Sequence, residues 1–435
     1  MMVLKFGGTS VGSADRIKKV ASLVTEGEEK LVVLSAMSGT TNSLVQIANY
    51  LFEKKNDLAA QLIEGLRLQY FSVVKELFEK PSSQEKMKEL INSHFDFLTG
   101  FTQDSFTIHE EKAVLAQGEL ISTALLHYYL EDQGVQSCLL LALQFMRIDK
   151  DLEPDHYYIK ENLSRLRKEN GNCKLYITQG FICRNAYGEI DNLKRGGSDY
   201  TASLVGVALE ADEVQIWTDI DGMHNNDPRV VDETNPIKQL SFDEAAELAY
   251  FGAKILHPSS ILPAKNANIP VRLKSTLSPS SPGTLITKNA DGGGVKAIAA
   301  KDGINAIKIN SGRMLLAYGF LRKVFEIFEL YKTPIDMITT SEVAVSVTID
   351  DATQLKSIQQ ELEKYGAVEV DTDQTIICVV GDFIKNEKGI AADILDKLRT
   401  IPIRMISYGG SNLNISFLIN TSDKEKALKS LNQLF

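Results

Sequence analysis

The stretch Lys5-Phe6-Gly7-Gly8-Thr9-Ser10-Val11-Gly12, almost at the start of the chain, says most about its fold. It follows the apolar residues Met2-Val3-Leu4, which are typical of a buried strand, and it precedes a segment of helical apolar spacing from about Ser13 to Glu26. A strand that turns through glycines into a helix exposes backbone N–H groups, and the helix dipole favours an anion there. With the charge of Lys5, the stretch predicts a phosphate-binding turn, although a glycine pair can also be a simple tight turn. It is no Walker A loop, because the lysine precedes the glycines.

The composition excludes several classes of protein. A chain of 435 residues predicts roughly two to four domains. The net charge of −10, without any Lys/Arg run, argues against a nucleic-acid partner. No apolar run is long enough for a membrane span, and the chain enters its first strand without room for a signal peptide. We therefore expect a cytoplasmic protein with no membrane partner.

The cysteines and histidines indicate neither a disulfide framework nor a metal site. The four cysteines are scattered and form no Cys-x-x-Cys pair, which favours a reducing cytoplasm. The six histidines do not pair at i, i+4 or with cysteines, so we expect no zinc site. The cysteines are Cys138, Cys173, Cys183 and Cys378.

Up to about residue 290, short apolar strands alternate with helices, and this order predicts an α/β fold with a mainly parallel sheet covered on both faces. Between about Leu51 and Ala116 no strand is expected, and helical spacing predicts a helical excursion. The segment Ser278–Gly294 is rich in Ser, Pro and Gly, so we expect domains at 1–290 and 291–435. The expected strands are Val3–Phe6, Leu31–Ser35, Leu139–Leu141, Leu175–Thr178, Val214–Thr218 and Pro270–Leu273.

The C-terminal part contains a repeat. Ile338–Asp350 aligns with Ile406–Asn420, and each copy follows the order strand, helix, strand, strand, helix. The second copy has no closing strand, whereas Val295–Ala300 has no evident partner in the first. We therefore predict that Val295–Ala300 pairs with the sheet containing Thr375–Val380, so that the two copies interlock. The copies would span 304–371, and 295–301 with 372–435.

Further polar motifs follow the expected strands, and ligands of parallel sheets bind beyond the carboxyl ends of strands. Each has a structural alternative. The hydroxyls of Ser35–Asn42 suit an ordinary helix cap. Glu119 and Asp199 could cap helix dipoles, and Lys254 could be a solvated lysine. The motifs are Ser35–Asn42, Gln117–Glu119, Lys194–Ala202, Trp217–Arg229 and Phe251–Pro258.

In their order along the chain and in their residue sequences, these motifs resemble the aspartokinase signatures of the amino acid kinase family. The resemblance rests on Lys5-Phe-Gly-Gly-Thr-Ser, Gly118-Glu119, Arg195-Gly-Gly-Ser-Asp-Tyr-Thr-Ala, Thr218-Asp-x-Asp-Gly with Asp227-Pro-Arg, and Phe251-Gly-Ala-Lys-x-Leu-His-Pro. The repeat resembles the tandem ACT domains of these enzymes. The resemblance covers essentially the whole chain. It implies an open, mainly parallel sheet sandwiched by helices, followed by two interlocked ferredoxin-like βαββαβ ACT domains.

The resemblance implies a monofunctional aspartate kinase, which transfers the γ-phosphoryl group of ATP to the β-carboxylate of L-aspartate. The products are 4-phospho-L-aspartate and ADP, in the first step of the lysine, threonine and methionine pathway. The nucleophilic carboxylate has a pKa of about 3.9 and is ionised at pH 7, so no general base is required. Two lysines, together with Mg²⁺ bound to the nucleotide phosphates, would offset the negative charge that accumulates between the phosphoryl donor and the carboxylate acceptor. No Gly-x-Gly-x-x-Gly opens a second dinucleotide domain, so we expect no fused homoserine dehydrogenase.

The resemblance also assigns residues. Lys5, Asp199 and Lys254 would be catalytic, with Asp199 orienting the basic groups. Ser35 and Thr41 would line the aspartate site, while Glu119 takes the substrate ammonium and Arg195 a substrate carboxylate. The nucleotide would meet Lys5, Phe6, Gly7, Gly8, Thr218, Asp219, His224, Arg229, Lys254 and Ile255.

The ACT pair implies an amino-acid effector that inhibits the kinase at a subunit interface of a homodimer or dimer of dimers. Asp336 would face the effector ammonium. The pattern is nearest to the lysine-sensitive branch, but it departs from it at Leu316, Ala317 and Pro334, and the kinase motifs depart at Cys183 and Lys194. The expected effector residues are Met314, Gly319, Leu321, Asp336, Thr340, Ser341 and Glu342.

Two other functions remain as alternatives. One is another amino acid kinase relative, such as an acetylglutamate or glutamate kinase, but these lack a tandem ACT tail. The other is a non-catalytic amino-acid sensor with a dead kinase domain. The presence of Lys5, Glu119, Arg195, Asp199 and Lys254 argues against the sensor.

Overall fold

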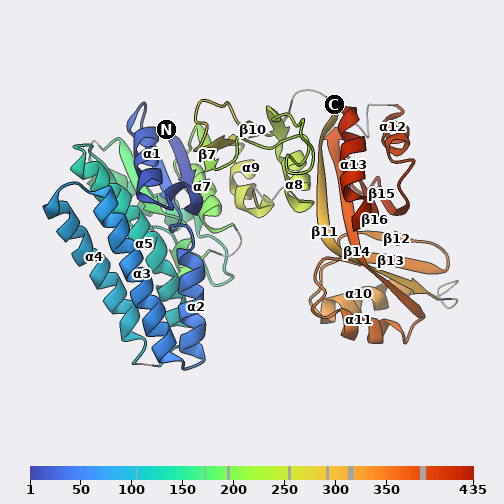
Figure 1. Cartoon of the computed structure of the whole chain (residues 1–435), viewed down its shortest axis with the longest axis horizontal. Helices are drawn as coiled ribbons and strands as arrows, with labels where there is room; N and C mark the ends of the chain where they lie inside the picture. The colour runs from blue at the N-terminus through green and yellow to red at the C-terminus, as the bar shows by residue number, and fades with distance from the viewer. Residues whose placement is uncertain are drawn as a thin grey trace. The chain divides into compact units, whose positions relative to one another are not determined.

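The structure is a computed structural model that divides into two compact units (Figure 1). The first unit comprises Met1–Met223 and Leu256–Asn289, and the second comprises His224–Ile255 and Ala290–Phe435. We describe each unit by itself. The residues described are 1–103, 105–171, 173–193, 196–252, 256–290, 293–311, 318–382 and 388–435.

The first unit is built on a mainly parallel sheet, as the sequence predicts. Its strands run in the order β3-β4-β2-β1-β7-β9-β10, and the pairs from β3 to β9 are parallel, whereas β10 is antiparallel to β9. The strand β2 is buried along its whole length, as expected for a central strand covered on both faces. The strands are β1 (Met2–Phe6), β2 (Lys30–Leu34), β3 (Cys138–Leu140), β4 (Leu175–Gln179), β7 (Glu213–Thr218), β9 (Val271–Ser275) and β10 (Thr284–Thr287).

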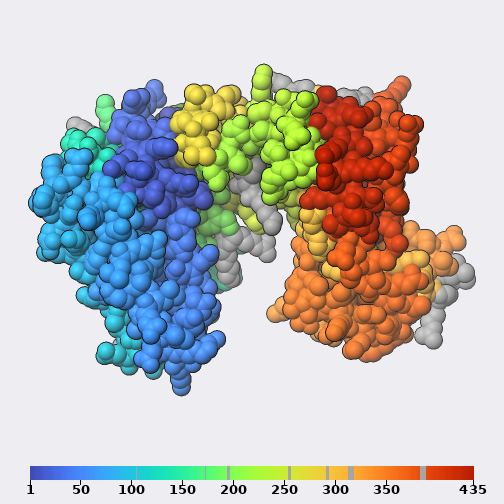
Figure 2. Space-filling view, in the orientation of Figure 1, coloured from blue at the N-terminus to red at the C-terminus, as the bar shows by residue number. Residues whose placement is uncertain are grey.

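The predicted helical excursion is confirmed. The helices α2 (Thr40–Phe52), α3 (Asn56–Leu77), α4 (Pro81–Gly100) and α5 (Ile108–Asp132) pack on one another, and α5 contacts β2, β3 and β4. With α1 (Ala14–Thr25), they share one hydrophobic core with one face of the sheet. Leu4, Phe6, Val32 and Leu34 point into this core. In Figure 2 the residues of α2, α3 and α4, coloured blue, form a continuous surface of the first unit.

The other face of the sheet carries α7 (Gly197–Ala208), which packs on β1 and contacts α6 (His156–Glu169) and α9 (Leu262–Asn266). Successive residues of a strand point to opposite faces. Lys5 therefore points to the α7 side, whereas Leu4 and Phe6 enter the core on the α1 side. The remaining short elements of this unit are β5 (Ile182–Arg184), β6 (Ile190–Asn192), η1 (Gly8–Val11), η2 (Ala142–Gln144) and η3 (Pro258–Ile261).

The scattered cysteines were expected to form no disulfide framework, but one pair is joined. Cys138 and Cys173 form a disulfide, while Cys183 and Cys378 are free and buried. Cys138 begins β3 and Cys173 lies just before β4, and these strands are neighbours in the sheet. The two cysteines are 35 residues apart in sequence, so their spacing alone does not reveal the contact.

The second unit contains an antiparallel sheet in the order β12-β13-β11-β14-β16-β15. Val295 pairs with Gly381 and Ala300 with Ile377, which confirms that Val295–Ala300 joins the sheet containing Thr375–Val380. The long strands β11 and β14 run through both repeat copies, so the two copies share one sheet. The strands are β11 (Gly294–Asn310), β12 (Ile338–Thr340), β13 (Ala344–Ile349), β14 (Ala367–Asp382), β15 (Ile403–Tyr408) and β16 (Asn414–Asn420).

Two pairs of helices cover this sheet. α10 (Phe320–Leu330) and α11 (Leu355–Leu362) pack on the half around Ile307, Val345 and Val347. α12 (Ile390–Lys397) and α13 (Lys424–Leu431) pack on the half around Ile377 and Phe417. The other elements of this unit are β8 (Gln239–Ser241), α8 (Phe242–Tyr250), η4 (Thr421–Asp423) and η5 (Asn432–Leu434).

The segment of α8 belongs with this sheet by its contacts. Glu247 on α8 accepts a hydrogen bond of 2.6 Å from the Asn414 side chain, and Asn226 donates to the Leu428 carbonyl at 3.0 Å. The backbone N–H of Ile298 donates to the Asn225 carbonyl at 2.8 Å. Within the described part of the chain, no helix is both long and apolar enough to cross a membrane.

Candidate active site

Lys5 and Asp199 form a largely buried ion pair in the first unit. Lys5 Nζ lies 2.6 Å from Asp199 Oδ1, and both side chains are less than 15% exposed. Lys5 comes from β1, and Asp199 comes from the first turn of α7. The pair therefore ties the glycine turn after β1 to the start of α7, where the helix dipole favours negative charge.

The turn after β1 requires glycine at position 8, because two loops pass closely there. A Cβ on Gly8 would lie 2.8 Å from the Ala36 carbonyl oxygen. The Ser38 N–H donates to the Gly8 carbonyl at 3.1 Å, and the Ser35 N–H donates to the Phe6 carbonyl at 3.2 Å. The glycines lead first into the 3-10 turn η1 and only then into α1, which begins at Ala14. The first loop is therefore held on the loop after β2.

A cavity of about 230 Å³ lies at this junction. It collects residues from the end of β1, from the loops after β2 and β4, from the N-termini of α2 and α7, and from the middle of α5. Four of the residues expected from the sequence line it together. The lining residues are Lys5, Ser35, Thr41, Glu119, Phe181, Gly196, Gly197 and Ser198.

Glu119 is not at a helix start, so the capping alternative was wrong. It lies inside α5, which begins at Ile108, and only 4% of the residue is exposed. Its Oε1 accepts a hydrogen bond from the Ala36 N–H at 3.1 Å, while its buried Oε2 has no hydrogen-bond partner among the described residues. Burial raises the pKa of Glu119 to about 7, although the Ala36 hydrogen bond opposes this shift.

Two close approaches place Glu119 and α7 at the cavity. A Cβ on Gly118 would lie 2.7 Å from Ala36 Cβ, so glycine lets α5 approach the loop after β2. The Ser35 hydroxyl donates to Ser198 Oγ at 2.9 Å, and the Ser122 hydroxyl donates to the Ser35 carbonyl at 2.8 Å. The cavity therefore has a cation on one wall and a buried carboxylate with a free oxygen on another. A ligand that carries both a carboxylate and an ammonium suits it.

The residues expected along the nucleotide are divided between the two units. Thr218 ends β7 in the first unit, and its hydroxyl donates to Asp219 Oδ1 at 3.0 Å. In the second unit, His224 Nδ1 lies 2.8 Å from Thr234 Oγ1. Arg229 is 83% exposed in its side chain, and its Nη2 lies 2.7 Å from Asp227 Oδ2. The Asp227-Pro-Arg motif therefore forms an ion pair, and its hydrogen bond from Arg229 lowers the pKa of Asp227.

Some expected residues lie outside the described residues: Arg195, Lys254, Ile255 and Met314. The backbone reaches Lys254 through Gly252, which has a φ of +140° and lies against β11. A Cβ on Gly252 would lie 2.3 Å from the Ala300 carbonyl oxygen.

The expected effector residues lie in the first repeat copy. Gly319 caps α10 with a φ of +81°, Leu321 lies in the first turn of that helix, and Thr340 ends β12. Ser341 and Glu342 form the turn that follows, where the Ala344 N–H donates to Ser341 Oγ. Asp336, before β12, is 1% exposed in its side chain and lies 2.7 Å from Lys301 Nζ.

Comparisons with known proteins identify the family. Residues 1–275 match the amino acid kinase family, and residues 377–435 match an ACT domain family. The chain is 34% identical to lysine-sensitive aspartokinase 3 of Escherichia coli, over 99% of this chain and 98% of that protein. The chain belongs to the aspartokinases.

Solved aspartokinase structures agree with this. The chain matches E. coli aspartokinase III in complex with lysine and aspartate with a TM-score of 0.82 at 33% identity, covering 100% of this chain and 99% of that one. It matches Clostridium acetobutylicum aspartate kinase with a TM-score of 0.87 at 27% identity over 100% of both chains. This chain therefore has aspartate kinase activity, a phosphoryl transfer to a carboxyl acceptor, under allosteric control.

Reasoning from the motifs did not assign four cavity residues of this aspartokinase, namely Phe181, Gly196, Gly197 and Ser198. Ser198 lies within the quoted Arg195-Gly-Gly-Ser-Asp motif and contacts Ser35, so the motif itself was the signal. Phe181 follows β4 with a φ of +66°, which is uncommon for a residue other than glycine. The Phe181 N–H donates to Thr201 Oγ1 at 3.0 Å, which fixes this backbone beside α7.

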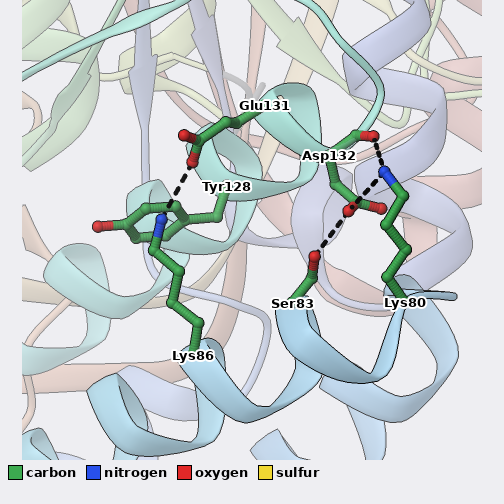
Figure 3. Close-up of a pocket in the computed structure, with 6 residues that line it drawn as sticks. All are labelled: Lys80, Ser83, Lys86, Tyr128, Glu131 and Asp132. Atoms are coloured by element: carbon green, nitrogen blue, oxygen red, sulfur yellow. Dashed lines mark hydrogen bonds and ion pairs between the residues drawn. The ribbon is translucent and has the colours of Figure 1, made fainter.

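A second cavity, of about 270 Å³, opens between α4 and α5 (Figure 3). Its cations are already paired. Lys80 Nζ lies 3.2 Å from Asp132 Oδ1, and Lys86 Nζ lies 3.3 Å from Glu131 Oε2 while it stacks on the Tyr128 ring. The Ser83 hydroxyl donates to Asp132 at 2.7 Å. This cavity gives no reason to expect a ligand.

Proposed function

We propose that the cavity lined by Lys5 and Glu119 is where L-aspartate accepts the γ-phosphoryl group of ATP. The observation that carries this is the buried Oε2 of Glu119, which has no hydrogen-bond partner among the described residues, on a side chain that lines the same cavity as Lys5. L-Aspartate has an ammonium and two carboxylates. Its ammonium would meet Glu119, and its β-carboxylate would lie toward Lys5.

The residues support a mechanism of positioning and charge neutralisation. The β-carboxylate is ionised at neutral pH, so the chain need not remove a proton from it. Lys5, held by Asp199, would stabilise the negative charge that gathers on the transferring phosphoryl group. The N-termini of α2 and α7 at the cavity, marked by Thr41 and Gly197, add backbone dipoles of the same sign. By the motif, Arg195 would bind the second substrate carboxylate.

ATP would lie along Phe6, Gly7, Gly8, Thr218, Asp219, His224 and Arg229, with Lys254 and Ile255 at the phosphates. An E. coli relative was solved with aspartate and ADP, at 32% identity and a TM-score of 0.81. Mg²⁺ would arrive on the phosphates of ATP, as it does in many kinases, and would supply further charge neutralisation. Among the described residues, no cluster of three or more His, Cys, Asp or Glu could hold a metal ion.

The ACT copies would bind an inhibitory amino acid, with lysine favoured, through Met314, Gly319, Leu321, Asp336, Thr340, Ser341 and Glu342. An E. coli relative was solved with lysine and aspartate. The buried Oδ2 of Asp336 has no hydrogen-bond partner among the described residues, which suits a ligand ammonium. We further propose a cytoplasmic homodimer or dimer of dimers, with a kinase domain at 1–290, a regulatory domain at 291–435, and ACT copies at 304–371 and at 295–301 with 372–435.

A coupled assay of ADP release tests the reaction. We expect ADP release with L-aspartate and ATP, and none with glutamate or N-acetylglutamate in place of aspartate. Turnover of either glutamate compound in preference to aspartate would indicate another amino acid kinase. Binding of an effector without any ADP release would indicate a non-catalytic sensor.

A further inference from the structure

A partly buried cluster in the second unit joins the proposed effector carboxylate to α8, with Asp336 and Lys301 largely buried and Tyr250 and Asp350 partly exposed. Asp336 Oδ1 accepts a hydrogen bond of 2.8 Å from the Tyr250 hydroxyl and lies 2.7 Å from Lys301 Nζ. Lys301 Nζ also lies 2.9 Å from Asp350 Oδ2 and 4.5 Å from the centre of the Tyr250 ring. Neither Tyr250 nor Lys301 belongs to the motifs that mark the family.

The charges of this cluster do not balance. Asp336 and Asp350 contribute two carboxylates, and Lys301 contributes one ammonium. Burial lowers the pKa of Lys301, but hydrogen bonds and charge from the two carboxylates outweigh it and raise that pKa, so Lys301 stays charged. Asp336 Oδ2 remains buried and without a partner among the described residues. This oxygen can accept a further cation, which would share Asp336 with Lys301.

The same cluster touches the segment that leads to Lys254. Tyr250 is the last residue of α8. Two residues later, Gly252 lies against the carbonyl of Ala300, the residue before Lys301. Residues 250 and 252 are therefore held on residues 300 and 301 by a hydrogen bond, a cation–π contact and a close backbone approach. Lys254, proposed to meet the nucleotide phosphates, follows two residues after Gly252.

We infer that Asp336 acts on the nucleotide-binding segment through Tyr250, and that Lys301 is the built-in cation with which the effector's ammonium competes for this carboxylate. Tyr250 and Lys301 are positioning residues, since neither touches the reacting atoms. The inference rests on the proposed effector site. An ammonium that enters at Asp336 weakens the hold of Asp336 on Lys301 and Tyr250, and the end of α8 moves. By thermodynamic linkage, nucleotide binding then changes the effector affinity by the same factor.

A double-mutant cycle tests the Tyr250 link without any effector. The dissociation constant of Mg-ADP is measured by calorimetry for the full chain and for Y250F, D336N and the double variant. We expect D336N to shift this constant by about five-fold or more alone, and by less than about two-fold in the Y250F background. Y365F, which removes a tyrosine hydroxyl elsewhere in the second unit, is the matched control and should bind Mg-ADP as the wild type does. Equal shifts in both backgrounds, or no shift, would overturn the link.

A lysine titration tests the competition. Removing the charge of Lys301 removes a repulsion within a few ångströms of the entering ammonium, so K301M should bind lysine about three-fold or more tightly. K308M, on the same strand but facing Glu369 at the surface, should leave the affinity unchanged. Unchanged or weaker binding by K301M overturns the competition. If the wild-type protein binds none of lysine, threonine and methionine, the effector proposal and the competition are both overturned. The double-mutant cycle with Mg-ADP still decides the Tyr250 link by itself.

Discussion

The ammonium of Lys5 and the carboxylate of Asp199 lie 2.6 Å apart, and this contact joins the first strand of the chain to the start of α7. The pair neutralises itself at rest. In the proposed site, a phosphoryl group that enters the cavity would add negative charge, which Lys5 would stabilise, while Asp199 would orient the Lys5 ammonium. The pair thus sets the geometry of the proposed reaction centre.

Replacement of Lys5 with alanine should lower kcat far more than it raises KM for either substrate. The Lys5 charge matters most in the transition state, where negative charge builds up on the phosphoryl group. The loss in kcat should therefore be about 100- to 1,000-fold. The measurement is steady-state ADP release. Lys19→Ala, an exposed lysine on α1, is the control and should leave kcat unchanged. A near-normal kcat in Lys5→Ala would contradict the role given to Lys5.

The KM for aspartate should depend on pH through Glu119. Burial raises the pKa of Glu119 to about 7, and only the ionised carboxylate binds the substrate ammonium well. As pH falls from 8 to 6, Glu119 takes up a proton in the free enzyme. The KM for aspartate should then rise, approaching about ten-fold per pH unit below the pKa.

Glu119→Gln provides the comparison for this pH dependence. Its KM for aspartate should be high and nearly constant between pH 6 and 8, because glutamine does not titrate. The KM for ATP, measured at saturating aspartate, should change little in the wild type over this range. A Glu119→Gln variant that keeps the wild-type pH profile would show that another group titrates.

Gly8→Ala should damage both the fold of the first loop and catalysis. The added Cβ would meet the Ala36 carbonyl at 2.8 Å, and backbone cannot yield as a flexible side chain does. We expect a loss of about 1–3 kcal/mol in the free energy of unfolding, measured by urea denaturation, and a lower kcat/KM. Gly65→Ala is the matched control, since a Cβ there meets nothing within 4 Å and alanine favours helix α3. Equal stability of Gly8→Ala and wild type would refute the close approach.

Asp336→Asn should weaken inhibition by the effector. Lysine, threonine and methionine are titrated into the kinase assay, and lysine is expected to inhibit. Loss of a charged partner of the ammonium should raise the half-inhibitory concentration by about ten-fold or more. Absence of inhibition by all three amino acids in the wild type would count against feedback control.

Local patterns were enough to predict much of this fold. The apolar strand before Gly7-Gly8, the helical spacing from about 51 to 116 and the repeat at Ile338 and Ile406 all depend on residues close in sequence. Backbone geometry repeats at short range, so such patterns reveal strands and helices directly. Even the pairing of Val295–Ala300 with the sheet containing Thr375–Val380 could be predicted from the repeat, because the second copy lacks a closing strand of its own.

Long-range contacts were beyond these patterns. The disulfide between Cys138 and Cys173 depends on β3 and β4 being neighbours. Glu119 looked like a helix cap because the start of α5 at Ile108 was not foreseen. The cavity residue Phe181 was missed for a similar reason, since its φ of +66° is a property of the folded backbone.

The sequence alone determined which chemical groups are available: a lysine before two glycines, a glutamate after a glycine, and a tail with two repeat copies. Only the tertiary structure decided which of these groups meet. It placed Lys5 against Asp199 and put Lys301 and Tyr250 on Asp336. It also left one oxygen of Glu119 and one of Asp336 without a partner in the part of the chain that is described. The physical reason is that burial and charge pairing arise between residues far apart in the chain, and no local spacing encodes them.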